Sequence, residues 1–250
     1  MLKHRVIPSL LLSNGELVKT QKFKKPKYVG DPLNAIRIFN DKEVDELMIL
    51  DIDASKSGLE PNYNLISNIS GECFMPLCYG GGIRNMEQAK KLFSLGVEKL
   101  SIHTAAIQDL DFITAIAKSY GSQSVIASVN IRKNWRGKRK LFLSSTNSIL
   151  NLSWQDHLRS LVNAGAGEVV LNAVDHDGMM AGMDLELIRE AASLLPIPLI
   201  ATGGVGSLDH IKAAVQCGAS AVAVGAFFVF SGPHRAVLIT YPNYKTLENL

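Results

Sequence analysis

The sequence has few cysteines, no long apolar run and almost no net charge. Its three cysteines, Cys73, Cys78 and Cys217, are odd in number and lack the spacing of metal ligands. We therefore predict no metal site and a reduced, cytoplasmic protein. No apolar run approaches the ~20 residues that a membrane-spanning helix needs, and residues 1–5 lack the apolar region of a signal peptide. We expect no membrane association.

The net charge of +3 is too small to indicate a nucleic-acid-binding protein. One run, residues 132–140, is nevertheless strongly basic. It fits either a solvated hairpin loop or a site for a polyanion, and the lack of a second basic stripe favours the loop. A nucleic-acid-binding role for this run would be revealed by salt-sensitive binding of DNA or RNA.

Two glycine-rich stretches, residues 76–84 and 198–206, are near copies of each other. Each joins a short apolar run to a Gly-Gly pair, which is typical of a buried strand, a turn and a helix start whose free N–H groups suit an anion. Pro76, Gly81, Gly82 and Gly96 match Pro198, Gly203, Gly204 and Gly218, always 122 positions apart (residue 198 against residue 76). The repeat predicts a fused duplication with one phosphate site in each half.

Eight apolar runs predict eight strands that alternate with helices. The expected strands are residues 6–12, 47–52, 76–79, 99–102, 125–130, 169–174, 199–202 and 221–224. Most are continuous apolar runs, as expected for strands buried on both faces. Together with the half-length repeat, they favour a single (βα)8 TIM barrel domain over residues 1–250, with a two-fold half-barrel repeat. A doubly wound open sheet is the alternative.

Helical spacing and capping residues predict the helices between these strands. The expected helices are residues 32–40, 62–69, 85–95, 110–120, 154–164, 184–194 and 207–217, with Asn85 and Ser207 as N-caps. Residues 17–31 are Lys-rich and interrupted by proline, so we expect a long loop there. Residues 231–234 are expected to begin a short last helix that Pro242 ends.

In such a barrel the carboxyl ends of the strands carry the site. Asp51 and Asp177 stand there and are candidates for general acid–base catalysis, although each also fits a loop cap. The candidate phosphate-binding residues are Gly82, His103 and Thr104 in one half and Gly178, Gly204, Gly225 and Ala226 in the other. Such glycine turns also fit simple connections, but two at a fixed offset favour phosphate binding.

Four charged residues stand at the opposite ends of the strands. Arg5, Glu46, Lys99 and Glu168 each lie at or just before the start of an apolar run. They fit either a solvated bottom layer or a closed ring of ion pairs that gates a pore. Because a barrel interior is normally packed, spacing alone favours the solvated layer.

The motifs in combination resemble the HisF family, the cyclase subunits of imidazole glycerol phosphate synthase. They are Arg-Val-Ile (5–7), Gly-Asp-Pro (30–32), residues 45–55, Gly-Gly-Gly-Ile-Arg (80–84), residues 101–106, Gly-Ala-Gly-Glu (165–168), Asp-His-Asp-Gly (175–178) and residues 203–207. The resemblance spans about residues 1–230.

The resemblance implies a (βα)8 barrel without a cofactor and with a HisH glutaminase docked on its base. Ammonia from glutamine would pass a charged gate, here Arg5, Glu46, Lys99 and Glu168, and travel along the barrel axis. The substrate of the family is a ribonucleotide with two phosphate ends. Ammonia attacks it, and cyclisation and cleavage yield imidazole glycerol phosphate for histidine biosynthesis.

The chain departs from the family at the reacting centre. The two acid–base aspartates of the family correspond to Leu11 and Asn130, and neither a leucine nor an amide acts as a general base. His103, Met179 and Ala226 stand where the family has Asn, Thr and Ser. This pattern resembles a diverged branch linked to surface polysaccharides.

That branch implies an ammonia-conducting subunit that supplies a separate sugar amidotransferase, in the synthesis of an amidino sugar of a lipopolysaccharide. The alternative is a working imidazole glycerol phosphate synthase subunit in which Asp51 and Asp177 substitute, with Asn130 remaining at the catalytic position.

Overall fold

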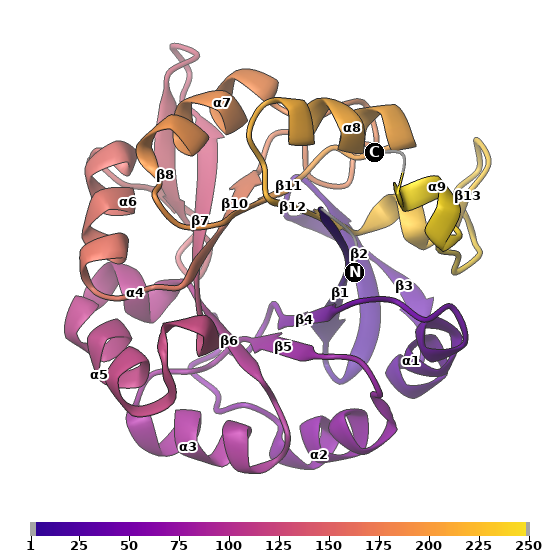
Figure 1. The fold of residues 1–250 in the computed structure, drawn as a ribbon, viewed down its shortest axis with the longest axis horizontal. Coiled ribbons are helices and arrows are strands. Elements are labelled where there is room, and N and C mark those ends of the chain that lie inside the picture. Colours follow the sequence, from indigo (N-terminus) through magenta and orange to yellow (C-terminus); the bar gives the residue numbers. More distant parts are fainter. Residues whose placement is uncertain (1–3, 249–250) are drawn as a thin grey trace.

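The computed structural model describes residues 4–248 and folds into a closed barrel of parallel strands with helices outside (Figure 1). The barrel strands are β1 (Arg5–Ser13), β4 (Leu47–Asp51), β5 (Leu77–Gly80), β6 (Lys99–Ile102), β7 (Val125–Lys133), β10 (Glu168–Ala173), β11 (Leu199–Thr202) and β12 (Ala221–Val224). They pair in this order, and β12 pairs with β1 to close the ring. The predicted TIM barrel is confirmed.

Helices follow the strands and bury their apolar faces against the barrel. They are α1 (Pro32–Asp41), α2 (Tyr63–Glu72), α3 (Met86–Ser94), α4 (Thr104–Gln108), α5 (Leu110–Tyr120), α6 (Trp154–Asn163), α7 (Leu185–Leu194) and α8 (Leu208–Gln216). The side chains of Asn85 and Ser207 accept hydrogen bonds from Gln88 N and His210 N, as predicted for N-caps. The short helix α4 and the 3₁₀ helices η1 (Ser122–Ser124) and η2 (Ala226–Phe228) were not expected from the sequence.

The half-barrel repeat is confirmed by the bounds of the elements. β5, α3 and β6 recur as β11, α8 and β12, each displaced by the 122 positions of the sequence repeat. The loops that carry Gly82 and Gly204 therefore hold equivalent places on opposite sides of the barrel.

The prediction of a loop over residues 17–31 is wrong. This segment forms an antiparallel hairpin of β2 (Glu16–Gln21) and β3 (Lys24–Gly30), and β2 pairs with the end of β1. Four successive residues of β2, from Leu17 to Thr20, are buried. Two of them are polar, and the mixed pattern concealed the strand because a lysine normally indicates a solvated position.

Two further excursions form hairpins. The basic run is a hairpin, as the favoured interpretation of the sequence had it: it comprises the end of β7, the turn and the start of β8 (Arg139–Leu143), and β9 (Ser148–Ile149) pairs with β8. The predicted helix from residue 231 is wrong, because β13 (Phe230–Ser231) and β14 (Ala236–Val237) form a small hairpin there, with Gly232 and Arg235 at positive φ. The last helix is instead α9 (Tyr244–Glu248), which lies beyond Pro242 in residues 243–250, where the sequence predicts a tail without a helix; residues 249–250 lie outside the described residues.

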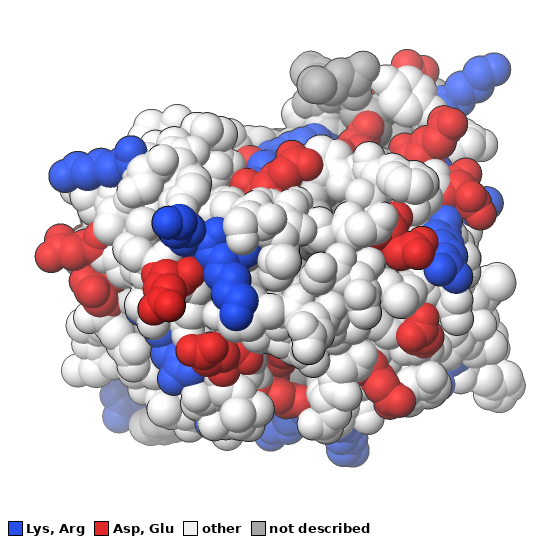
Figure 2. Space-filling view, turned by 90° about the horizontal axis from the view of Figure 1, so that it is seen from below, with Lys and Arg blue, Asp and Glu red and all other residues white. Residues whose placement is uncertain are grey.

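The interior of the barrel is an apolar cluster separate from the core between strands and helices. It consists of Ile7, Met48, Cys78, Ile126, Val170, Ile200, Ala221 and Ala223. No helix in residues 4–248 is both long and apolar enough to cross a membrane. On the side covered by α2 and α3, positive and negative side chains are intermingled (Figure 2).

Candidate functional site

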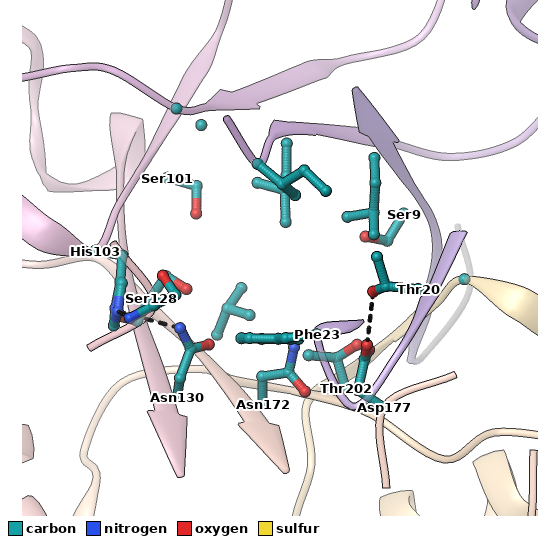
Figure 3. A pocket seen from close by; sticks show the side chains of 18 of the residues that line it. Ser9, Thr20, Phe23, Ser101, His103, Ser128, Asn130, Asn172, Asp177 and Thr202 are labelled. Atoms are coloured by element: carbon teal, nitrogen blue, oxygen red, sulfur yellow. Dashed lines mark hydrogen bonds between the residues drawn. The ribbon is translucent and has the colours of Figure 1, made fainter. Parts of the chain in front are cut away.

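A cavity of ≈ 330 Å³ lies at the carboxyl ends of the barrel strands (Figure 3). It brings together every candidate that the sequence placed at this end. Lining it are Asp51, Gly82, His103, Thr104, Asn130, Asp177, Gly178, Gly204, Gly225 and Ala226, together with Leu11. Its floor includes Met48, Val170 and Ala223, which also belong to the apolar interior cluster. The cavity therefore lies directly above the interior of the barrel.

Asn130 and His103 form a hydrogen-bonded pair in one wall of the cavity (Figure 3). His103 Nδ1 lies 2.9 Å from the carbonyl oxygen of Ser128, so this nitrogen carries the proton. His103 Nε2 then accepts from the Asn130 amide at 3.1 Å. Burial lowers the pKa of His103, so its imidazole is neutral near pH 7. The Asn130 amide and the His103 imidazole, which this wall presents to the cavity, are therefore both neutral.

Asp177 forms the opposite wall with residues of the β2–β3 hairpin. Thr20 Oγ1 donates to Asp177 Oδ2 at 3.3 Å (Figure 3). Burial raises the pKa of Asp177 to about 6, against the opposing charge of Lys19. A carboxyl that titrates near neutral pH is suited to general acid–base catalysis.

Lys19 is a site residue that the sequence did not reveal. It is buried beside Gly225, and its ammonium group donates to the carbonyl oxygen of Ser9. Burial lowers its pKa to about 8. Thr20 and Phe23 of the same hairpin also line the cavity. The segment looked like a solvated loop, and because four successive residues of β2 are buried, no alternation of inward and outward residues indicates them in the sequence.

Asp51 and Gly82 lie on the rim of the cavity with part of their bonding capacity in use. Asp51 Oδ1 accepts from the backbone N–H groups of Asp53 and Ala54, both at 2.9 Å. Gly82 N donates to Ser55 Oγ at 3.2 Å. Asp51 therefore caps its own loop through one oxygen. Both of these hydrogen bonds use Oδ1, and neither uses the second carboxylate oxygen of Asp51.

The glycine turns of the second half are places of close backbone approach. A Cβ atom at Gly204 would lie 2.1 Å from the carbonyl oxygen of Gly182, and one at Gly178 would lie 1.9 Å from that of Thr20. Both glycines also have positive φ. Only glycine fits these positions, which bring the chain close around the cavity.

The four charged residues at the other end of the barrel form a closed ring of ion pairs. Arg5 donates to Glu46 at 2.6 Å and to Glu168 at 2.5 Å. Lys99 Nζ lies 3.1 Å from Glu46 and 2.9 Å from Glu168. Each cation thus joins both anions, and the solvated bottom layer favoured from spacing alone is replaced by a closed network.

Electrostatics hold the ring in its charged form. Burial alone would raise the pKa of Glu168, but hydrogen bonds from Arg5 and Lys99 outweigh it and hold that pKa below its usual value. The glutamates likewise outweigh the effect of burial and raise the pKa of Arg5 and of Lys99. Above the ring lies the buried Cys78 thiol, whose pKa burial raises well above its usual value, so the next layer of the interior is uncharged.

In residues 4–248 no three His, Cys, Asp or Glu side chains come together in a group able to hold a metal ion.

Comparisons with known proteins identify relatives along the whole chain. Residues 5–233 match the family model described as histidine biosynthesis protein. A Pseudomonas aeruginosa protein provisionally named imidazole glycerol phosphate synthase subunit hisF2 is 53% identical over 249 residues, 99% of each chain. A Leptospira interrogans protein provisionally named subunit HisF is 45% identical over 252 residues, 100% of this chain and 99% of its own. The imidazole glycerol phosphate synthase subunit HisF of Dictyoglomus turgidum is 33% identical over 230 residues, 92% and 91% of the two chains.

Proposed function

Because the chain belongs to the histidine biosynthesis protein family and is a HisF-like subunit, we propose that it receives ammonia from a HisH-like glutaminase and passes it through the barrel. The glutaminase docks on the end that carries the charged ring. The ammonia serves an amidotransfer on a separate acceptor rather than a cyclisation in the barrel itself. The ammonia is supplied to a separate sugar amidotransferase, which acts in lipopolysaccharide synthesis in the cytoplasm.

The observation that carries the proposal is the contrast between the two ends of the barrel. At the base, Arg5, Glu46, Lys99 and Glu168 keep a complete ring of ion pairs. At the top, the cavity is lined by Leu11 and a hydrogen-bonded Asn130, at the positions to which the resemblance assigns the two family aspartates. Losing a general acid–base group costs ~10²–10⁴-fold where proton transfer limits the rate, so the cyclase step loses its main groups while the path for ammonia remains.

The interior between these ends suits ammonia rather than ammonium. The cluster around Ile7, Met48 and Ile200 is buried and apolar. A charged ammonium ion would lose its hydration there without a partner, whereas neutral ammonia has little to lose. The ring, whose groups all stay charged, therefore supports a role in keeping ammonium out at the entrance.

A second function is supported by Asp177, whose carboxyl has a pKa of about 6 beside Lys19. In this alternative Asp177, with Asp51 and Asn130, carries out the cyclase reaction of imidazole glycerol phosphate synthase. The phosphate ends of the substrate would lie at Gly82, His103 and Thr104 and at Gly178, Gly204, Gly225 and Ala226.

The two functions are separated by the cyclase rate of the purified chain, measured with the ribulosyl-formimino ribonucleotide and ammonium salt. We expect no cyclase turnover. A rate like that of a HisF subunit with both aspartates, lost on Asp177→Asn, would overturn the separate acceptor and establish the alternative. The conduit itself is tested with the glutaminase and glutamine, where Lys99→Met should lower the share of released ammonia that leaves at the upper cavity.

A further inference from the structure

Phe74 is a large apolar side chain that the fold leaves in solvent. It lies between α2 and β5 and is 86% exposed, while its neighbour Met75 is buried. Packing of the barrel does not use this ring. An exposed phenylalanine contributes nothing to folding, whereas aromatic side chains dominate the energetics of protein interfaces.

The position of Phe74 places it on the same end of the barrel as the charged ring. Pro76, which follows it closely, accepts a hydrogen bond from Leu47 N at 2.9 Å. Leu47 begins β4 and directly follows Glu46 of the ring. The loop of Phe74 therefore borders the entrance that the ring surrounds.

The backbone on both sides of the Phe74 ring is held in place. Asn40 of α1 accepts from Phe74 N at 3.2 Å and donates to the carbonyl oxygen of Glu72 at 2.6 Å. The thiol of Cys73 donates to the carbonyl oxygen of Met75 at 3.3 Å. Because the loop is already fixed in the free protein, a partner that buries Phe74 loses little entropy in ordering it.

Charged residues of both signs lie near Phe74. Glu72 precedes it by two residues and is paired with Arg37. Glu43 N donates to the carbonyl oxygen of Asn40, the residue that clamps the loop, and the charge of Glu98 acts on the neighbouring Cys73 thiol. Lys42 is the positive residue beside Glu43. Because Glu72 is already paired with Arg37, Glu43 and Glu98 are the carboxylates offered to basic side chains around an apolar pocket of a partner.

We propose that Phe74 is the aromatic anchor of the glutaminase interface and enters an apolar pocket of that subunit, which is rimmed by Lys or Arg side chains facing Glu43 and Glu98. The inference rests on the proposed function, because the partner is the glutaminase. It adds which residue supplies the binding energy and what chemistry the partner presents.

Trp135 provides a matched control for the test. It is also 86% exposed, but it lies at the turn between β7 and β8, near the end of the barrel with the cavity. Removing either ring changes an exposed aromatic side chain of similar size and should leave the urea unfolding midpoint unchanged. Only Phe74→Ala should affect glutaminase binding.

The measurement is the dissociation constant between the full chain and the HisH-type glutaminase of the same organism, by calorimetry. We expect Phe74→Ala to weaken binding roughly 30-fold or more, Phe74→Trp to retain most of it, and Trp135→Ala to bind like the wild type. Glu98→Lys should slow association, most at low salt. Equal affinity of Phe74→Ala and the wild type would overturn the anchor but leave the conduit intact. A wild-type chain that neither binds nor stimulates the glutaminase would overturn the proposed function itself.

Discussion

The hydrogen bond between Asn130 and His103 makes a specific prediction about restoring the cyclase. Asn130→Asp replaces the amide donor, 3.1 Å from His103 Nε2, by a carboxylate that only accepts. Since His103 Nδ1 already uses its proton on Ser128, two acceptors would face each other. The imidazole relieves this conflict by taking up a second proton, and the new aspartate becomes half of an ion pair.

The size of the effect follows from the burial of the pair. A hydrogen bond to a charged group contributes about 1.5–3 kcal/mol, and a pKa unit corresponds to about 1.4 kcal/mol. Asn130→Asp should therefore raise the pKa of His103, which burial now lowers, by roughly 1–2 units. The same bond lowers the pKa of the introduced carboxyl and makes it a weaker base.

The assay has a spectroscopic and a kinetic part. NMR titration of the His103 ring should show its midpoint moving upward in Asn130→Asp. In ammonium-dependent cyclase assays, Leu11→Asp with Asn130→Asp should recover less activity than the same pair with His103→Asn, which frees the carboxylate. If His103 titrates alike in wild type and Asn130→Asp, or the double variant matches the triple one, the coupling inferred from the geometry is refuted.

Three further predictions concern stability. Glu168 has a lowered pKa, so its contribution is present above the pKa of the unfolded chain and is lost as pH falls through the folded value; urea unfolding at pH 7 and pH 3 should show this loss, and Glu168→Gln should reduce it. Asp177 has a raised pKa, so the protein loses stability as pH rises from about 4 to about 6; Lys19→Met should raise that pKa further and extend the loss to higher pH, which unfolding at pH 5 and 8 would detect. Gly178→Ala, with φ of +68° and a Cβ 1.9 Å from the Thr20 carbonyl oxygen, should destabilise by at least about 1–2 kcal/mol and loosen the β2–β3 hairpin, seen as faster hydrogen exchange of its amides.

The barrel was predictable because its signal is repeated. The apolar runs and the 122-residue repeat each indicate the same strands, and the glycine turns lie where strand, turn and helix meet. All ten candidate residues of the upper end were predictable as neighbours for the same reason, since the carboxyl ends of parallel strands meet at one face. Topology alone places them around one cavity.

The β2–β3 hairpin was not predictable in this way. Lys19 and Thr20 point into the protein although their side chains are polar, and their partners Ser9 and Asp177 lie on other elements. A sequence window contains only the lysine and not the carbonyl oxygen that it meets. Polar residues buried by long-range contacts are invisible to periodicity, which assumes that polar residues face water.

The charged ring shows that sequence spacing can place residues at one end of a barrel without showing how they pair. Spacing placed Arg5, Glu46, Lys99 and Glu168 at one end of the barrel, but the solvated layer and the closed ring have the same spacing. What decides between them is the inward direction of each side chain and the 3% exposure of the Glu46 side chain. Those depend on strand tilt and on the packing of the layer above.

The different fates of the two barrel ends have a common energetic origin. In the ring each charge has two partners, and removing one leaves a partly buried charge without compensation, which is strongly destabilising. Asn130 has the opposite character, because its buried side chain is neutral at a place where a carboxylate would have to be desolvated. Asn130 even gains a partner in the neutral His103. Under the proposed function, a neutral Asn130 therefore carries no penalty in stability, whereas loss of a ring charge does, so folding stability favours the intact charged ring together with a neutral group at position 130.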